Sequence, residues 1–219
     1  MRKFAVIVAA GSGTRMGNLF PKQLASLFGK PVIRLTVEIF ASAFNDINII
    51  VVAHPDYLEE TREAVAGFGA VVIPGSDSRF GSVKAGLALV EEAAIVFVHD
   101  GVRCLLTKVL IRRCYDMAVK YGNAVPVMPP VDSLRIIKGE KNERIDRYMV
   151  RLVQTPQTFQ AGILKKAYAE ANGEDFADDA EVAESAGVQI NLVEGESTNI
   201  KLTYAADMSF AEMILAQRT

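Results

Sequence analysis

The sequence predicts an α/β fold built on a mostly parallel β-sheet, from which a β-arm protrudes. Short apolar runs alternate with helix-like stretches along the first 128 residues, which is typical of parallel strands joined by right-handed crossover helices. The first apolar run leads directly into a loop rich in glycine. Beyond residue 131, two polar strand-like segments flank a turn and lack the apolar side chains for a core of their own.

The chain has 219 residues, of which 50% are hydrophobic and 23% are charged, and its formal net charge is −2. This length is enough for one large domain that buries roughly 70% of its unfolded surface. We therefore expect a single domain over residues 1–219, with the β-arm inserted at about residues 131–154.

The same composition limits the partners and the compartment. A nearly neutral chain without a dense cluster of Lys and Arg argues against nucleic acid as the main partner. No apolar run approaches the ~20 residues that span a bilayer, and no signal peptide is evident. The two cysteines, Cys104 and Cys114, lack zinc-site spacing and suggest reduced thiols, so we expect a cytoplasmic protein without a membrane partner.

The first half of the chain supplies the sheet and its crossovers. Pro31 fits the first helical position of a helix, and His54 with Pro55 ends a strand and opens the next helix. Each apolar run predicts a buried strand, and these fall at residues 4–8, 47–53, 70–73, 94–98 and 124–128. Between them we expect helices at residues 31–43, 55–68, 82–91 and 107–121.

The second half departs from this alternation. Residues 133–138 and 144–153 are expected to form the two strands of the arm, around a turn at residues 139–142. Because such a ribbon is marginal alone, it must pack on its own domain or on a second copy of the chain, and we favour the arm of a homodimer. Further helices are expected at residues 161–171, 178–186 and 205–216, with a late strand at residues 189–193.

The glycine-rich loop is Ala9-Ala10-Gly11-Ser12-Gly13-Thr14-Arg15-Met16-Gly17, and Pro21-Lys22-Gln23 follows it. Small residues allow backbone N–H groups to approach a ligand closely, and glycine adopts backbone angles that other residues resist. Arg15 and Lys22 add positive charge, so the stretch suits the phosphates of a nucleotide. The alternative is a structural glycine turn beside two surface cations.

The spacing excludes two common nucleotide motifs. No Gly-Lys-Ser/Thr closes the loop, so it is not a Walker A motif. The glycines are spaced G-x-G-x-x-x-G, one residue longer than the dinucleotide fingerprint. The acidic residue expected about 20 residues later at a strand end is also missing, since Glu38 lies in a helical stretch.

Two further stretches follow predicted strands, namely residues 76–82 and Asp100. In a parallel sheet the carboxyl ends of the strands meet at one edge, where ligands bind, so both are expected beside the glycine-rich loop. A carboxylate there suits Mg²⁺, which takes one or two protein carboxylates together with phosphate and water. The alternative is that Asp100 caps a turn or a helix. His99 could orient Asp100, or it could simply pack in the core.

Arg15, Lys22 and a metal ion would suit attack on an α-phosphorus with pyrophosphate leaving, a reaction that depends mainly on positioning and charge. A second group of cations, Arg103, Arg147 and Lys201, could hold an anionic acceptor, although each is also compatible with a surface charge. The sequence offers no Ser-His-Asp set, paired carboxylates or zinc cluster that would indicate another chemistry.

One set of motifs runs from residue 5 to residue 203, which is nearly the whole chain. The motifs are A-A-G-x-G-x-R-M at residues 9–16, P-K-Q at residues 21–23, Ser82-Val83, His99-Asp100-x-x-Arg103, Asp146-Arg147, Thr155-Pro156-Gln157, Glu194-Gly195 and Asn199-Ile200-Lys201-Leu202-Thr203. Together and in this order, they resemble the family of cytidylyltransferases that act on 2-C-methyl-D-erythritol 4-phosphate. One motif alone would be weak, but the combination is specific.

The resemblance implies a Rossmann-like, three-layer nucleotidyltransferase domain, similar to the glycosyltransferase-A fold. It implies a Mg²⁺-dependent reaction in which CTP and a polyol phosphate give a CDP-linked product and pyrophosphate. In that family the polyol phosphate is 2-C-methyl-D-erythritol 4-phosphate, and the step belongs to the non-mevalonate route to isoprenoid precursors.

The resemblance also implies roles for individual residues. Arg15 and Lys22 would stabilise the transition state, and Asp100 would bind the metal. The acceptor would be bound by Arg103, Ser133, Arg147 and Lys201, of which Arg147 and Lys201 also count as catalytic. Ser133 and Arg147 would reach the acceptor from the arm of the other subunit. The nucleotide would be surrounded by Ala9, Ala10, Gly11, Gly13, Gly75 and Ser82.

The sequence departs from the family pattern mainly on the acceptor side. Gly101-Val102 stands in place of Ala-Ala, and Cys104 stands in place of Pro. Ala177 and Thr198 stand where many members carry a threonine and an acidic residue. Val102 resembles the sister group of ribitol 5-phosphate cytidylyltransferases, which is the first alternative function. A nucleotide-binding module or an NAD(P)-dependent oxidoreductase is a more distant alternative.

Overall fold

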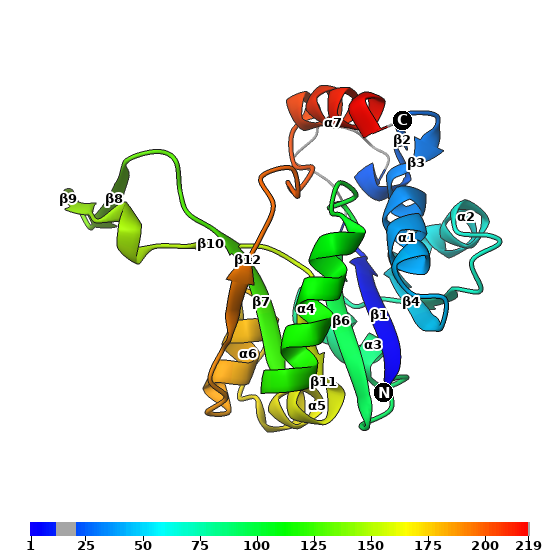
Figure 1. Ribbon diagram of the computed structural model, residues 1–219, viewed down its shortest axis with the longest axis horizontal. Helices are drawn as coiled ribbons and strands as arrows, with labels where there is room; N and C mark the ends of the chain where they lie inside the picture. Colours follow the sequence, from blue (N-terminus) through cyan, green and yellow to red (C-terminus); the bar gives the residue numbers. More distant parts are fainter. Residues whose placement is uncertain (12–20, 219) are drawn as a thin grey trace.

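The computed structural model describes residues 1–11 and 21–218, and in this part of the chain eight strands form one sheet (Figure 1). The strand order is β10-β7-β11-β6-β1-β4-β5, and β12 also pairs with β7. The strands are β1 (Arg2–Ala9), β4 (Ile47–Ala53), β5 (Val71–Pro74), β6 (Ala94–Asp100), β7 (Asn123–Met128), β10 (Leu152–Val153), β11 (Gln157–Gln160) and β12 (Leu192–Glu194). The predicted α/β class is confirmed.

One half of the sheet, β6-β1-β4-β5, is entirely parallel. Val8 near the end of β1 lies opposite Asp100 on one side and Val52 on the other. The side chains of β1, β4 and β6 are almost all buried, which explains their continuous apolar runs, since helices cover both faces. The carboxyl ends of these strands therefore meet at one edge of the sheet, as the sequence predicts.

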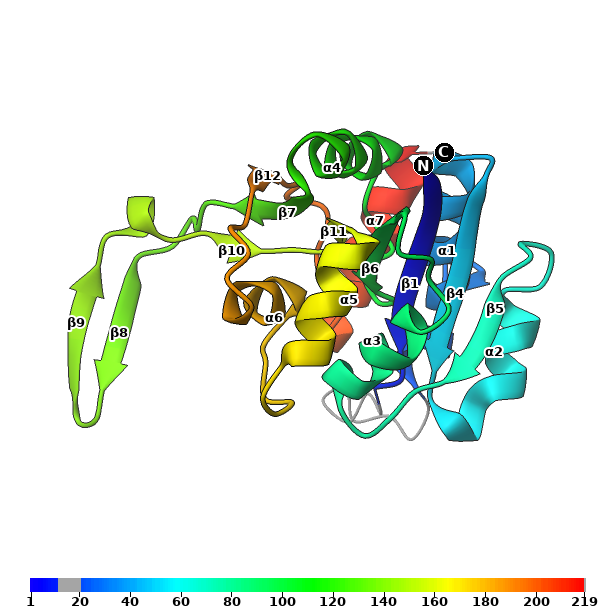
Figure 2. The same ribbon diagram turned by 90° about the horizontal axis from the view of Figure 1, so that it is seen from below.

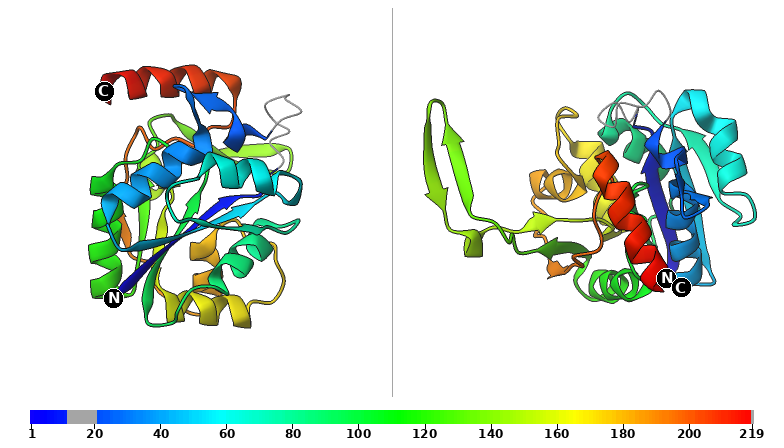
Figure 3. Two further views of the ribbon diagram at one scale, coloured as in Figure 1. Left: turned by 90° about the vertical axis from the view of Figure 1, so that its right-hand side faces the viewer. Right: turned by 90° about the horizontal axis from the view of Figure 1, so that it is seen from above.

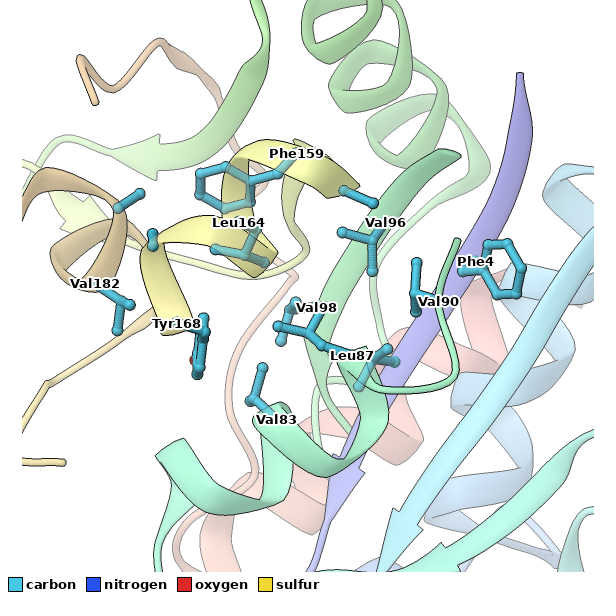
Figure 4. Packing of buried hydrophobic residues seen from close by; sticks show 14 of the residues in the cluster. Phe4, Val83, Leu87, Val90, Val96, Val98, Phe159, Leu164, Tyr168 and Val182 are labelled. Atoms are coloured by element: carbon cyan, nitrogen blue, oxygen red, sulfur yellow. The ribbon is translucent and has the colours of Figure 1, made fainter. Parts of the chain in front are cut away.

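Helices on both faces produce a three-layer architecture (Figure 2). The helices are α1 (Val32–Ala43), α2 (Leu58–Ala64), α3 (Arg79–Leu87), α4 (Lys108–Tyr121), α5 (Ala161–Glu170), α6 (Asp179–Ser185) and α7 (Ala205–Arg218). On one face Phe40 of α1 and Leu110 of α4 pack against Phe97. On the other face, Leu87 of α3 and Leu164 of α5 pack near Val96 and Val98 (Figure 4).

The other half of the sheet contains a strand that the sequence analysis did not predict. β11 lies antiparallel between β6 and β7, with Phe159 opposite both Val96 and Asn123. Gln157 and Thr158 of this strand are polar yet fully buried, so the segment lacks the apolar run that marks the other strands. The late strand is also shifted, from the predicted 189–193 to Leu192–Glu194, where it runs parallel to β7.

Several helix ends differ from the expectations because local caps decide them. The third helix begins at Arg79 and not at residue 82, since the Ser78 side chain accepts a hydrogen bond from the Gly81 N–H at 2.9 Å. Pro31 is the N-cap of α1, one position before the predicted place. The stretch predicted as one helix over residues 55–68 divides into a 3₁₀ turn (Pro55–Tyr57) and the shorter α2.

The arm is a two-stranded hairpin that extends away from the sheet (Figures 2 and 3). Its strands are β8 (Leu134–Lys138) and β9 (Lys141–Ile145), joined by a tight turn in which Gly139 has a positive φ of 61°. The second strand was expected at residues 144–153, after a turn at residues 139–142. It starts at Lys141 and ends at Ile145, so both bounds were wrong. Asp146 instead accepts a hydrogen bond from the Tyr148 N–H and starts a 3₁₀ turn over Arg147–Met149.

The C-terminal helix crosses above the carboxyl edge of the sheet (Figure 1). Ala211 and Ile214 of α7 pack against Leu105 and Leu202, so the helix supports the two segments that follow β6 and β12. Arg218 at its end donates a hydrogen bond to the Leu105 carbonyl at 2.8 Å. Across the residues described, no helix is long and apolar enough to cross a membrane.

Candidate functional site

A pocket with a volume of about 360 Å³ lies at the carboxyl edge of the parallel strands. It is formed by the end of β1, the turn before α3, the end of β6 and the loop before α7. Its lining residues are Val8, Ala9, Ala10, Gly11, Lys22, Gln23, Ser76, Asp77, Ser78, Arg79, Ser82, Asp100, Val102 and Lys201. The structure thus brings together the start of the glycine-rich loop, residues 76–82 and Asp100, as expected.

The start of the glycine-rich loop is held by Gln23, which is 2% exposed. Its side-chain amide donates hydrogen bonds to the carbonyl oxygens of Ala9 at 2.7 Å and Gly11 at 3.2 Å. These bonds join the segment that carries Gln23 to the end of β1. They thereby hold the neighbouring Lys22, which lines the pocket, close to the loop. Gly13 and Arg15 lie outside the described residues.

The turn between β5 and α3 approaches the loop closely at Gly75. A Cβ atom on Gly75 would lie 2.5 Å from the Ala10 Cβ and 2.9 Å from the Ser82 Oγ, so only glycine fits. Ser82 is buried, and its hydroxyl accepts a hydrogen bond from the Ser76 N–H at 3.0 Å. Because Ser78, Arg79 and Ser82 line the pocket, the N-terminus of α3 faces it, and the helix dipole favours an anion there.

Asp100 is the last residue of β6, and a short chain of hydrogen bonds fixes its backbone. The Thr155 hydroxyl accepts from the Asp100 N–H at 3.1 Å and lies 3.0 Å from Nδ1 of His99. Burial lowers the pKa of His99 to about 4, so the ring is neutral near pH 7. Because Nε2 lies 3.1 Å from the Arg103 carbonyl, which can only accept, Nε2 carries the proton and Nδ1 accepts from Thr155. His99 thus packs in the core and also orients Asp100 through Thr155.

The Asp100 carboxylate is buried but remains ionised. Nζ of Lys201 lies 3.0 Å and Nε of Arg103 lies 3.3 Å from Oδ2, while Nε of Arg79 lies 3.7 Å from Oδ1. Burial alone would disfavour the charge, but the cations Lys201, Arg79 and Arg103 outweigh it and hold the pKa of Asp100 well below its ordinary value. Asp100 is therefore a fixed negative charge within a positive surrounding.

One buried residue, Asn199, helps to position two of these cations, Arg103 and Lys201. Arg103 donates from Nη1 to the Asn199 carbonyl at 2.8 Å, and the Asn199 side chain donates to the Thr155 carbonyl at 2.8 Å. Asn199 is fully buried, and its bond ties the loop that carries Lys201 to the segment between β10 and β11, beside Asp100. Thr155 and Asn199 belong to motifs that the sequence analysis singled out, but it assigned them no role, because the sequence does not show which buried groups they would bond to.

The structure does not bring every predicted residue to the pocket. Ser133 and Arg147 lie in the exposed arm, and Arg147 donates a hydrogen bond to the Val131 carbonyl at 2.9 Å. Conversely, Arg79 lines the pocket but was not among the predicted site residues. Its place in a turn after a strand, beside Ser78 and Ser82, was the available signal.

The donor set fits a divalent cation that is shared with a substrate. Within the described residues, no group of three or more His, Cys, Asp or Glu side chains could hold a metal by itself. Asp100 and Asp77 are the acidic residues among those that line the pocket. One ionised carboxylate, completed by phosphate oxygens and water, is the usual manner in which proteins hold Mg²⁺.

Comparison with known proteins gives a consistent result. Residues 4–217 match the family model of 2-C-methyl-D-erythritol 4-phosphate cytidylyltransferase. A protein of that name from Bacteroides thetaiotaomicron is 39% identical over 219 residues, which cover 98% of this chain and 100% of the relative. The crystal structure of the enzyme of that name from Thermus thermophilus is 33% identical, with a TM-score of 0.82 over 99% of this chain and 100% of that one. A synthase structure from Anaerococcus prevotii is 25% identical, with a TM-score of 0.86 over 98% of both chains.

Substitution of Gly75 tests the close approach that shapes the pocket. Gly75→Ala places a methyl group against Ala10 and Ser82, and overpacking of this kind costs about 1–3 kcal/mol of unfolding free energy. The matched control is Gly162→Ala in α5, where the nearest atom to a new Cβ is 3.5 Å away. Chemical denaturation should show a loss of stability for Gly75→Ala and none for Gly162→Ala. Equal stability of Gly75→Ala and the unmodified protein would contradict the geometry.

Proposed function

The chain belongs to the family of 2-C-methyl-D-erythritol 4-phosphate cytidylyltransferases, and on that premise we propose that the pocket at the carboxyl edge carries out the family's reaction. A phosphate oxygen of 2-C-methyl-D-erythritol 4-phosphate attacks the α-phosphorus of CTP. The bond from the α-phosphorus to its bridging oxygen breaks, and pyrophosphate leaves. The product is CDP-methylerythritol, a precursor in the non-mevalonate route to isoprenoids. The observation that carries this assignment is the ionised Asp100 among cations, between the start of the glycine-rich loop and the N-terminus of α3.

On the nucleotide side we assign the small residues of the first loop and of the turn before α3. Ala9, Ala10, Gly11 and Ser82 line the pocket, and Gly75 allows the two backbones to approach each other. Lys22 would stabilise the charge that develops at the α-phosphate, together with Arg15. Gly13 completes the proposed nucleotide set, although it and Arg15 lie outside the described residues.

We assign Asp100 as the ligand of a Mg²⁺ ion. When bound, the ion would neutralise phosphate charge and make the pyrophosphate a better leaving group. The low pKa of Asp100 supports this role, because a metal ligand of this kind must be ionised at neutral pH. The chain's own contribution is to fix this carboxylate through the Thr155 and His99 hydrogen bonds.

On the acceptor side we assign Arg103 and Lys201. Both lie on the Oδ2 side of Asp100, and both are charged groups of the kind that bind a phosphomonoester. Lys201 would orient the attacking phosphate, since its side chain lines the pocket and is partly exposed.

Ser133 and Arg147 would complete the acceptor site from a second copy of the chain. We propose a homodimer whose catalytic domain carries the arm at about residues 131–154. What supports it is the apolar surface of the arm and its base, where Val131 is 85% and Met149 is 84% exposed. Such a surface indicates a partner.

Both cysteines are buried and free, and we place the enzyme in the cytoplasm, where thiols stay reduced.

An acceptor panel tests the proposed reaction. We expect pyrophosphate release with CTP, Mg²⁺ and 2-C-methyl-D-erythritol 4-phosphate, because the family and the pocket agree. Ribitol 5-phosphate is the matched alternative, motivated by Val102, which lines the pocket. Turnover with ribitol 5-phosphate alone would contradict the proposed acceptor, and turnover with neither would contradict cytidylyl transfer to a polyol phosphate.

Subunit mixing tests the shared site. Arg15→Ala damages the loop and Arg147→Ala damages the arm, so each homodimer should be nearly inactive. In an equal mixture half of the dimers are mixed, and each has one intact site, so about a quarter of the unmodified activity should return. Mass spectrometry of the intact dimers confirms the exchange of subunits. A fully exchanged mixture without recovery of activity would rule out a site made by two chains.

A further inference from the structure

A buried ion pair lies beside the pocket and joins three helices. The Arg79 guanidinium at the start of α3 bonds to Asp179 at the start of α6, with 3.2 Å from Nη1 to Oδ1 and 2.6 Å from Nη2 to Oδ2. Tyr168 of α5 donates from its hydroxyl to Oδ1 of Asp179 at 2.7 Å. Asp179 is fully buried and Tyr168 is nearly so, with its ring stacked on Phe80 (Figure 4 shows Tyr168 beside α3).

The same guanidinium faces the proposed metal ligand. Nε of Arg79 lies 3.7 Å from Oδ1 of Asp100, which is beyond hydrogen-bond distance. The other two cations, Arg103 and Lys201, approach Oδ2. Arg79 therefore faces Oδ1 of Asp100 but does not form a hydrogen bond with it.

Asp179 explains why Arg79 stops at this distance. Arginine bonds preferentially to a carboxylate through two parallel N–H groups, and Asp179 provides this arrangement in a buried place. If Asp179 lost its charge, the guanidinium would be left partly buried without its main counter-ion. The carboxylate next to it is Asp100, less than 1 Å beyond hydrogen-bond distance.

We propose that Asp179, supported by Tyr168, is a positioning residue that holds Arg79 away from Oδ1 of Asp100 and so keeps this oxygen open to the divalent cation. Arg79 remains in the pocket wall, where its charge faces the polyphosphate. The inference rests on the proposed function, because it takes Asp100 as the metal ligand.

The alternative is that the ion pair only fastens α6 to α3. Both accounts predict some loss of stability when the pair is broken, so stability alone does not separate them. They differ in the role of Arg79, which competes for Asp100 in our account and is passive in the alternative. The decisive comparison is therefore between a variant that frees Arg79 and one that also removes its charge.

The experiment measures Mn²⁺ binding by electron paramagnetic resonance in the presence of saturating CTP. For Asp179→Asn, we expect the affinity for Mn²⁺ to fall by roughly ten-fold, because the freed guanidinium competes for Asp100. In the double variant Arg79→Gln/Asp179→Asn, we expect the affinity to return to within about three-fold of the unmodified protein. Asp178→Asn is the control, since Asp178 caps the same helix through the Glu181 N–H and does not contact Arg79. Its Mn²⁺ affinity should be unchanged.

Turnover gives a second readout. The Mg²⁺ concentration for half-maximal rate should rise in Asp179→Asn, while the rate at saturating Mg²⁺ changes much less. If Asp179→Asn fails to fold, Tyr168→Phe loosens Asp179 without removing a charge, and a smaller weakening of Mn²⁺ binding is expected.

Three results would overturn the inference. The first is an unchanged Mn²⁺ affinity in folded Asp179→Asn, which would show that the ion pair does not protect Asp100. If Asp179→Asn does not fold, an unchanged affinity in Tyr168→Phe would show the same. A double variant as weak as the single one would show that the pair is only structural. If the unmodified protein turned over CTP but bound no Mn²⁺, the metal role of Asp100 and this inference would both be wrong, whereas cytidylyl transfer would stand.

Discussion

The site depends on one buried carboxylate that stays ionised. Removing Asp100 from water disfavours its charge, and the structure offsets this with Lys201, Arg103 and Arg79. These cations come from three different segments, so the charge balance at Asp100 also fixes how the turn before α3 and the loop before α7 meet the end of β6. Electrostatics and tertiary structure are therefore coupled at this edge of the sheet.

Much of this arrangement could be predicted from the sequence. Alternating apolar runs predicted the parallel strands, and the rule that their carboxyl ends share an edge brought Asp100, Ser82 and the glycine-rich loop together. The predictions failed where buried polar side chains replace an apolar pattern. β11 was missed because two of its fully buried positions are occupied by the polar residues Gln157 and Thr158. The sequence does not show which residues these two side chains pack against.

Long-range hydrogen bonds explain the other omissions. Arg79 and Asp179 are 100 residues apart, and Asn199 meets Thr155 across 44 residues. No periodicity or spacing links such pairs, since each depends on how the helices and loops pack once the sheet has formed. The start of α3 was misplaced for a related reason, because the Ser78 cap outweighs the apolar pattern that follows it.

The most direct test of the account is a carbon-13 NMR titration of the aspartate carboxyl groups, with the Asp100 signal assigned by its loss in Asp100→Asn. An ordinary aspartate has a pKa near 3.9, so at pH 4 about half of such groups are protonated. We predict that the Asp100 signal stays at its ionised position from pH 7 down to pH 4. A midpoint at or above the ordinary value would show that the surrounding cations do not control this carboxylate, and would contradict the central claim.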